Sequence, residues 1–467
     1  MSTSNTPNLE EVRELPGDEP EDVVFGSLYG LRTIQLNRPK KLNSLNASMI
    51  RKIAPRLREW EKSDMANVVV MKGAGDKAFC AGGDVTQLAG YNQEGPEGWR
   101  KSADYFSLEY KLDHYISTYK KPYVAFMDGI TMGGGVGLSI HAPFRVATER
   151  TIFAMPETTI GFFPDVGASF FLPRMNGFVG TYLALTSDRL SGVNVFYSGV
   201  ATHYLHSTSL NALESRLAEL RFKDYDDMDT RLGRVNDTLE EYCTGLPYDQ
   251  PMLLAGELRK AIDRCFNKTT VDEIIEALKA ERGVTEEWAQ KTIAVLHKRS
   301  PTAVHVTLKQ MRNSRGWAMK ETFWREHQIA SQFMQHPDFT EGVSALLIRK
   351  EKPTWQPATL EDIKDGDAVS EPFFRPSRDD KDMMSFWVDR DFTEYPYAKF
   401  GVPGEEEISR LVGRGEYTPE EVQKMVVASR GSRQGVKEVV AEILERKVAV
   451  NGKGRAEWIR VGADKSK

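Results

Sequence analysis

The chain has 467 residues, of which 40% are hydrophobic and 28% are charged, the ordinary range of soluble globular proteins. Its formal net charge of −5 gives no global electrostatic signature of nucleic-acid binding, although a local basic patch is compatible with it. The three scattered cysteines argue against a disulfide framework and a thiolate metal site, and no apolar run is long enough to predict a membrane span.

The first 22 residues are polar and acidic, and we expect them to be disordered or irregular. A mitochondrial transit peptide would be rich in arginine and poor in acids, and a secretory signal would carry an apolar stretch. Neither pattern is present. From the residues alone, the chain is expected to be cytosolic as written or a mature form whose leader was removed.

From Val23 onward, strand-like and helix-like segments alternate, which predicts an α/β core. A helix is predicted over Ser48–Glu61, where apolar side chains recur at helical spacing. β-Branched and apolar runs predict strands over Val23–Leu36, Val68–Met71, Tyr123–Met127 and Thr151–Ala154. From about Gly177 the pattern becomes mostly helical, as in Asn211–Leu220 and Val271–Glu281.

The C-terminal part changes composition. Residues 362–413 are rich in prolines, aromatics and charges, which predicts a linker or docking segment, and two short amphipathic helices follow at Thr418–Ser429 and Gln434–Val448. Residues 414–467 hold twelve Lys or Arg and eight Asp or Glu, a net charge of +4. Such a basic extension could contact RNA phosphates or an acidic protein. A small solvated helical appendage would explain the charge equally well.

The first candidate site is Lys77–Asp84, where Gly82 and Gly83 could let a backbone amide approach a ligand. The alternative is a plain turn between a strand and a helix, capped by Asp84. Cys80 could be a nucleophile, but a cysteine between Phe and Ala is more often a small buried hydrophobic residue.

The second candidate is the glycine-rich segment Met132–Leu138, which leads into an apolar helix. Amides at a helix N-terminus carry partial positive charge and can stabilise an oxyanion. A tight packing turn is the alternative. The segment lacks the Lys-Ser or Lys-Thr of a phosphate loop and does not match the dinucleotide fingerprint.

The third candidate pairs Glu157 with Asp165, which lie in an apolar, aromatic stretch. Carboxyls in such surroundings can have raised pKa values and act as general acid or base. A surface glutamate and an aspartate in a turn are the alternative. The eight histidines show no metal-ligand spacing, so no metal site is expected.

Together and in this order, the three segments resemble the crotonase (enoyl-CoA hydratase/isomerase) superfamily, and more closely the 3-hydroxyisobutyryl-CoA hydrolases. The resemblance implies an α/β fold of repeated ββα units over residues 23–361, a helical C-terminal part and a small basic helical extension over 414–467. The matching segments are Leu36–Pro39, Lys72–Gly75, Phe79–Asp84, Gly129–Ser139, Phe144–Glu149, Phe153–Gly167 and His336–Val343.

The resemblance also implies roles for single residues. The backbone amides of Gly83 and Gly134 would form an oxyanion hole for the thioester oxygen, and two convergent amides stabilise the tetrahedral oxyanion more than the neutral thioester. Glu157 matches the catalytic glutamate of the family and Asp165 the acidic residue of the hydrolases. Glu109 matches an acid at the hydroxyl end of the substrate. The implied substrate-binding residues are Glu109, Gly134, Glu157 and Asp165.

One departure separates hydrolysis from hydration. A hydratase usually carries a second catalytic glutamate where this chain has Gly137, so concerted water addition lacks a partner. The implied activity is therefore hydrolysis of 3-hydroxyisobutyryl-CoA, or a similar short 3-hydroxyacyl-CoA, in valine catabolism. Coenzyme A would be part of the substrate, and no cofactor is expected. Whether Glu157 activates water or attacks the thioester carbon is left open. The role of Asp165 is also left open: it could orient water or the 3-hydroxyl, or pass a proton to the leaving thiolate.

The extension suggests a second role. Extended hydrolase-like proteins of this kind occur in the small subunit of fungal and plant-type mitochondrial ribosomes. That resemblance implies mitochondrial ribosomal proteins and ribosomal RNA as partners through residues 414–467. Both resemblances imply a protein of the mitochondrial matrix.

Overall fold

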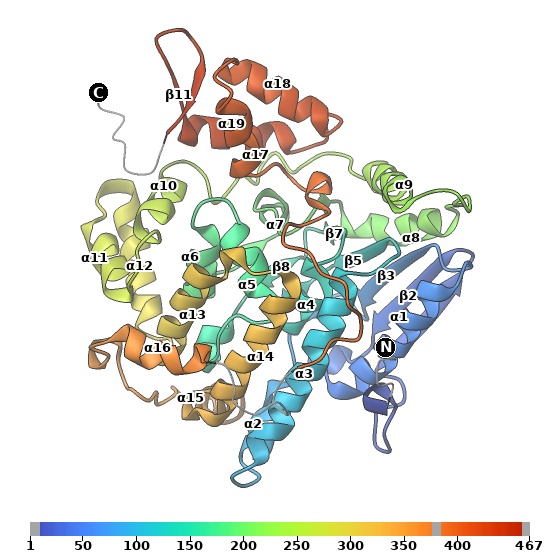
Figure 1. Ribbon diagram of the computed structural model, residues 1–467, viewed down its shortest axis with the longest axis vertical. Helices are drawn as coiled ribbons and strands as arrows, with labels where there is room; N and C mark the ends of the chain where they lie inside the picture. The colour runs from blue at the N-terminus through green and yellow to red at the C-terminus, as the bar shows by residue number, and fades with distance from the viewer. Residues whose placement is uncertain (1–9, 376–383, 460–467) are drawn as a thin grey trace, which may run out of the picture.

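The computed structural model describes residues 10–375 and 384–459, which form an α/β body and a smaller C-terminal unit (Figure 1). The larger sheet has the order β1-β2-β3-β5-β7-β10 and is parallel except for the pair β1–β2. A second sheet has the order β4-β6-β8-β9. The strands are β1 (Val23–Leu28), β2 (Leu31–Leu36), β3 (Val68–Gly73), β4 (Ala78–Cys80), β5 (Tyr123–Met127), β6 (Ile130–Met132), β7 (Phe144–Ala147), β8 (Ile152–Ala154), β9 (Leu190–Ser191), β10 (His203–Tyr204), β11 (Val448–Val450) and β12 (Ala456–Trp458).

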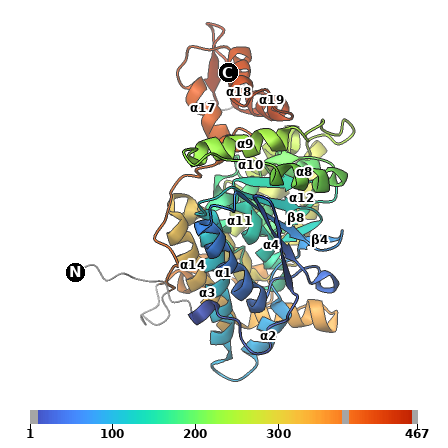
Figure 2. The same ribbon diagram turned by 90° about the vertical axis from the view of Figure 1, so that its right-hand side faces the viewer.

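Helices surround both sheets (Figures 1 and 2). This covering is why β5 is buried along its whole length, as expected of a parallel strand. The helices are α1 (Ala47–Lys62), α2 (Val85–Asn92), α3 (Gly98–Ser117), α4 (Gly134–Ile140), α5 (Ala168–Phe171), α6 (Val179–Thr186), α7 (Val193–Tyr197), α8 (Leu210–Ala218), α9 (Met228–Glu240), α10 (Gly256–Cys265), α11 (Val271–Ala280), α12 (Glu286–Leu296), α13 (Pro301–Asn313), α14 (Met319–Gln335), α15 (Pro337–Val343), α16 (Gly366–Phe374), α17 (Glu405–Val412), α18 (Pro419–Ser429) and α19 (Val436–Lys447).

The prediction of one strand over Val23–Leu36 is wrong, because the segment is a hairpin. Tyr29 has φ +48°, a left-handed conformation that ends β1, and β2 then returns antiparallel to it. Gly30, directly after Tyr29, is the signal of this turn in the sequence. The helix predicted at Ser48–Glu61 and the strand predicted at Tyr123–Met127 are confirmed as α1 and β5.

Residues 10–22 are irregular yet packed against the body. Val12 is 2% exposed and belongs to the main hydrophobic core. The carboxyl of Asp22 is buried and pairs with the Lys52 ammonium at 2.7 Å. Residues 1–9, the rest of the predicted acidic N-terminus, lie outside the described residues.

The C-terminal appendage, defined here as residues 405–459, has a hydrophobic core of its own. This core contains Ile408, Val422, Val440 and Ile443, which come from α17, α18 and α19. Helix α17 lies within the segment expected to be a linker, and it packs with the two predicted helices. Figures 1 and 2 show the appendage at one end of the molecule, beyond α10.

Buried ion pairs join the appendage to the body. Arg446 of α19 lies 3.0 Å from Asp263 of α10, and Lys447 lies 3.1 Å from the same carboxylate. Arg433 pairs with Glu240 of α9 at 2.6 Å. Some of the basic residues of the extension therefore form ion pairs with acidic groups of the body. Fewer of them are left to face solvent.

Candidate active site

The two glycine segments meet at one edge of the second sheet. Strand β4 leads to Gly82 and Gly83, strand β6 leads to Gly133 and Gly134, and β4 and β6 are hydrogen-bonded neighbours. A Cβ atom added to Gly134 would lie 3.3 Å from the amide nitrogen of Gly83. The structure therefore brings Gly83 and Gly134 together, with no side chain between their backbones.

Two buried glutamates face these glycines. Glu109, on α3, is 2% exposed, and a Cβ atom on Gly134 would collide with its Oε1. Glu157 follows β8 and is 5% exposed, with its Oε1 3.2 Å from the position of a Cβ on Gly133. Glu109 Oε1 and Glu157 Oε2 have no hydrogen-bond partner among the described residues, and for Glu109 this unpartnered oxygen is the atom that lies at Gly134.

Asp165 completes the set of predicted residues. Its Oδ2 accepts a hydrogen bond of 2.6 Å from the hydroxyl of Tyr110, the neighbour of Glu109 on α3. Burial raises the pKa of Asp165 to about 7, and the Tyr110 hydrogen bond opposes that rise. Its charge is close enough to Glu109 and Glu157 to raise the pKa of both. All five residues implied by the resemblance thus lie in one buried region.

Two further acids of this region were missed by the sequence analysis. Asp113 and Glu326 are both fully buried, and the charge of Asp165 raises the pKa of each. Asp113 could have been found, because it lies four residues after Glu109 and so on the same face of α3. Glu326 comes from α14 and has no local signal in the sequence.

The position of Asp113 explains why residue 137 is a glycine. A Cβ atom at Gly137 would lie 2.5 Å from Asp113 Oδ2 and 2.8 Å from Cβ of Val166. Any side chain at this position must displace one of them. The place where a hydratase carries its second glutamate is therefore already occupied.

These carboxyls, which we call the acid cluster (Glu109, Asp113, Glu157, Asp165 and Glu326), have few compensating contacts. Burial is the largest cause that raises the pKa of Glu109, Asp113 and Glu157 well above the usual range, and repulsion within the cluster adds to it. Tyr105 lowers the pKa of Glu109 through a hydrogen bond. Burial and mutual repulsion therefore both favour the neutral form of these carboxyls.

The acid cluster predicts how stability depends on pH. Burial raises the pKa of Asp165 from 3.8 to about 7 and that of Glu326 from 4.5 to about 8. Between the unfolded and folded pKa values of each group, the folded state holds more protons than the unfolded state. The contribution of these two carboxyls to folding stability is therefore complete below about pH 4 and is lost as the pH rises through 7 and 8. We expect Tm to fall between about pH 5 and about pH 8, and to fall less in Asp165→Asn. Calorimetric scans at the two pH values check this, and equal slopes in both proteins would contradict it.

The remaining sequence candidates have structural explanations. Cys80 is fully buried, and burial raises the pKa of its thiol to about 12, which favours the packing interpretation over a nucleophile. Asp84 holds the N-cap position of α2 without capping it by its side chain. Its carboxylate instead pairs with Arg38 at 3.0 Å and Lys41 at 3.2 Å.

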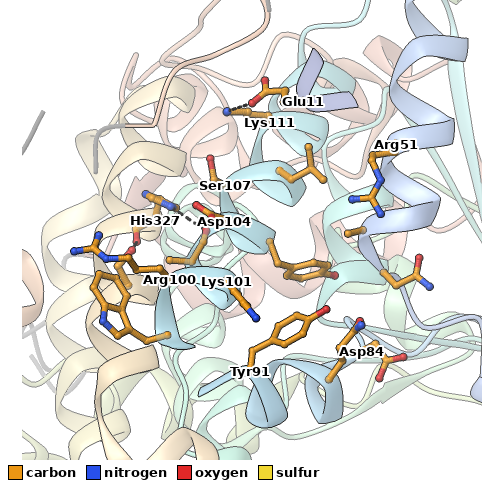
Figure 3. Close-up of a pocket in the computed structure, with 18 of the residues that line it drawn as sticks. Glu11, Arg51, Asp84, Tyr91, Arg100, Lys101, Asp104, Ser107, Lys111 and His327 are labelled. Carbon is orange, nitrogen blue, oxygen red and sulfur yellow. Dashed lines mark hydrogen bonds and ion pairs between the residues drawn. The ribbon is translucent and has the colours of Figure 1, made fainter. Parts of the chain in front are cut away.

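A cleft of about 1240 Å³ lies beside the acid cluster, between α1, α2, α3 and α14 (Figure 3). Tyr105 and Asp84 line it, and the Tyr105 hydroxyl lies 3.0 Å from the position of a Cβ on Gly83, so the cleft comes close to one glycine segment, although neither the site glycines nor the acid cluster are among its lining residues. Five acidic and seven basic side chains line it, and this excess of positive charge suits phosphates, although six of the basic side chains are also in ion pairs. The basic side chains are Arg38, Lys41, Arg51, Arg100, Lys101, Lys111 and Arg375.

Within residues 10–375 and 384–459, no group of three or more His, Cys, Asp or Glu side chains is arranged to hold a metal ion. No helix in the same part of the chain has the length and apolar character needed to cross a membrane.

Paired glycine backbones opposite buried carboxyls, on a fold of this kind, define the crotonase class of proteins. The chain belongs to this family, because the sequence-family model described as "Enoyl-CoA hydratase/isomerase" matches residues 31–374. Among solved structures, a carnitinyl-CoA dehydratase from Mycobacterium thermoresistibile is 34% identical with a TM-score of 0.68, over 78% of this chain and 99% of that one. The predicted fold class is confirmed.

Two kinds of relatives are similar over different lengths. The small ribosomal subunit protein mS47 of Neurospora crassa is 58% identical over 95% of this chain and 88% of its own. The mitochondrial 3-hydroxyisobutyryl-CoA hydrolase of Gallus gallus is 42% identical over 74% of this chain and 88% of its own. Both resemblances expected from the sequence are confirmed by these matches, and so is the mitochondrial location.

Proposed function

We propose that this protein hydrolyses 3-hydroxyisobutyryl-CoA, or a similar short 3-hydroxyacyl-CoA, in valine catabolism. The observation that carries this proposal is the contact of Gly83 with Gly134 opposite the buried carboxyl of Glu157. The occupied space at Gly137 supports hydrolysis rather than hydration. The hydrolase relatives add support through 42% identity over most of their length.

The reaction can be written from these positions. The thioester oxygen lies between the amides of Gly83 and Gly134, which stabilise the oxyanion formed when the carbonyl carbon is attacked. Glu157 either takes a proton from the attacking water or attacks the carbon itself and is then released by water. The C–S bond breaks, and the thiolate takes a proton from Asp165, which is partly protonated near pH 7.

The rest of the substrate has a place as well. Glu109 lies beside Gly134 and would accept a hydrogen bond from the 3-hydroxyl group. The coenzyme A part would lie in the cleft, whose basic residues attract its phosphates. Coenzyme A then enters the site as part of the thioester substrate and leaves as a product, and no separate cofactor is required.

A second candidate function is a structural role in the mitochondrial small ribosomal subunit. The Neurospora relative matches 95% of the chain, which includes the appendage, whereas the Gallus hydrolase matches 74% of it. We propose that the appendage contacts ribosomal proteins or ribosomal RNA. The acid cluster is retained, so the two functions are compatible.

One experiment tests both proposals. Native mitochondrial extract is separated on a sucrose gradient, the protein is located by antibody, and pooled fractions are assayed for free thiol released from 3-hydroxyisobutyryl-CoA. Hydrolysis by the purified protein supports the first function, and its complete absence removes it. Comigration with small subunits supports the second function, whereas free protein throughout the gradient contradicts it.

A further inference from the structure

The turn that carries Asp165 has an unfavourable backbone. Val166 has φ +55° and Gly167 has φ +85°, so two successive residues are left-handed. Glycine adopts this conformation freely, but a β-branched residue does so only when its surroundings enforce it. Val166 is buried, and the fold must therefore hold this turn in place.

Glu326 of α14 supplies the strongest of these restraints. Its Oε2 accepts a hydrogen bond from the amide of Gly167 at 2.7 Å, and its Oε1 accepts one from the amide of Ser169 at 2.8 Å. Both carboxyl oxygens are thus used on the backbone just after Asp165. The side chain is fully buried, so no water competes for these bonds.

Two other helices brace the same turn. Gln310 of α13 donates from Nε2 to the carbonyl of Pro164 at 2.6 Å and to Oγ of Ser169 at 2.7 Å. His141, after α4, donates from Nε2 to the carbonyl of Val166 at 2.9 Å. Because these bonds come from separate helices, the direction of the Asp165 side chain is set by the tertiary fold rather than by the turn itself.

Glu326 and Asp165 also interact electrostatically. Burial raises the pKa of Glu326 to about 8, its two amide hydrogen bonds oppose the rise, and Asp165 adds to it. By reciprocity, a charge on Glu326 disfavours a charge on Asp165. The titratable groups that interact with Glu326 are Asp165, Asp113, Glu157 and Tyr110.

We propose that Glu326 is a positioning residue for hydrolysis, which acts through Asp165 by holding the strained Asp165–Gly167 turn. The inference rests on the proposed hydrolase function. Both hydrogen bonds of Glu326 go to the backbone just after Asp165, so the geometry links Glu326 to the site through the direction in which Asp165 is presented.

The test compares Glu326→Gln, Asp165→Asn and the double variant. In Glu326→Gln one carboxyl oxygen becomes an NH2 group, which cannot accept from a backbone amide. We expect kcat to fall about 100-fold with KM nearly unchanged, because a small displacement of a reacting group has an effect of this size. The limb of the pH profile that reports Asp165 should stay in place, because a Glu326 carboxyl with a pKa of about 8 is mostly neutral while Asp165 titrates near pH 7. The double variant should be no slower than Asp165→Asn alone.

The control is Glu281→Gln, which alters another buried glutamate, bonded to Arg264 and Thr285 outside the acid cluster. It should lower Tm and leave the pH profile in place. Additive losses of kcat in the double variant would overturn the proposal. So would a Glu326→Gln protein that has a lower Tm but keeps the kcat of the wild type.

Two further measurements keep the outcomes separate. If Glu326→Gln does not fold, Gln310→Met removes a second brace of the turn and should give the same selective loss of kcat. If the wild-type protein releases no thiol, the proposed function fails, but the inference is still decided by stability. The Tm values of the wild type and the three variants must then show a coupling between the two positions, and additive changes in Tm would overturn the inference.

Discussion

Replacing Glu157 with glutamine is expected to lower thiol release from 3-hydroxyisobutyryl-CoA by about a thousandfold, the scale of acid–base catalysis by a positioned group. Glutamine keeps the shape of the side chain but can neither take a proton from water nor attack the thioester carbon. Because burial and the neighbouring acids raise the pKa of Glu157, the wild-type carboxyl is costly to ionise. The variant should therefore fold normally, with Tm at about pH 8 equal to or above that of the wild type.

Steady-state thiol assays and calorimetry on the same preparations check this result. A suitable control is Glu276→Gln, because Glu276 is exposed on α11 and, among the residues that the structure describes, its ion pair is with Lys279 along the helix. The control should retain full activity. A Glu157→Gln protein with wild-type kcat would remove Glu157 from the mechanism. A strongly destabilised one would show that the carboxyl holds the fold instead.

Replacing Arg446 with alanine is expected to release the appendage from the body while the site stays active. The side chain is buried and lies 3.0 Å from Asp263, 2.6 Å from Glu405 and 2.8 Å from Glu442. Removing Arg446 deprives three carboxylates of a buried partner, although Arg259 and Lys447 stay beside Asp263 and Arg259 stays beside Glu405, so the cost is up to about 3 kcal/mol. This free-energy cost weakens the contact between the appendage and the body, because Asp263 belongs to the body and both glutamates belong to the appendage.

Limited proteolysis should then cut near α17 in Arg446→Ala but not in the wild type, and comigration with small subunits should be lost. Thiol release should be unchanged. Arg410→Ala is the matched control, because Arg410 is exposed and pairs only with Glu406 within α17, where such a pair contributes about 0.4 kcal/mol. Loss of hydrolysis together with the appendage would show that the two parts of the chain work as one.

The sequence predicted the local elements better than the contacts between them. The glycines at 83 and 134 and the acids at 109, 157 and 165 follow from short motifs, because each motif places one group at the end of one strand or on one helix face. The roles of these five residues stay predictions until the variants are measured. Their meeting at one edge depends on the pairing of β4 with β6, which no single motif encodes.

Glu326 shows why the rest could not be predicted. It lies 159 residues from Gly167, and the amides that it binds are backbone groups with no signature in the sequence. The hairpin at Tyr29 was missed for a different reason, since a tyrosine is an unusual residue in a left-handed turn. The net charge of the extension was counted correctly, but charge alone does not say which cations pair with the body.

The position of the appendage bears on how the two functions could coexist. The residues that line the cleft come from the N-terminal segment, from α1 to α3 and from residues 327–385, and none comes from the appendage. A partner bound to the outer face of the appendage would neither cover the cleft nor touch the acid cluster. The two ligands would then bind with a coupling free energy close to zero, each with the same affinity whether or not the other is present. The protein could then bind to an assembly through the appendage and still bind its substrate with unchanged affinity.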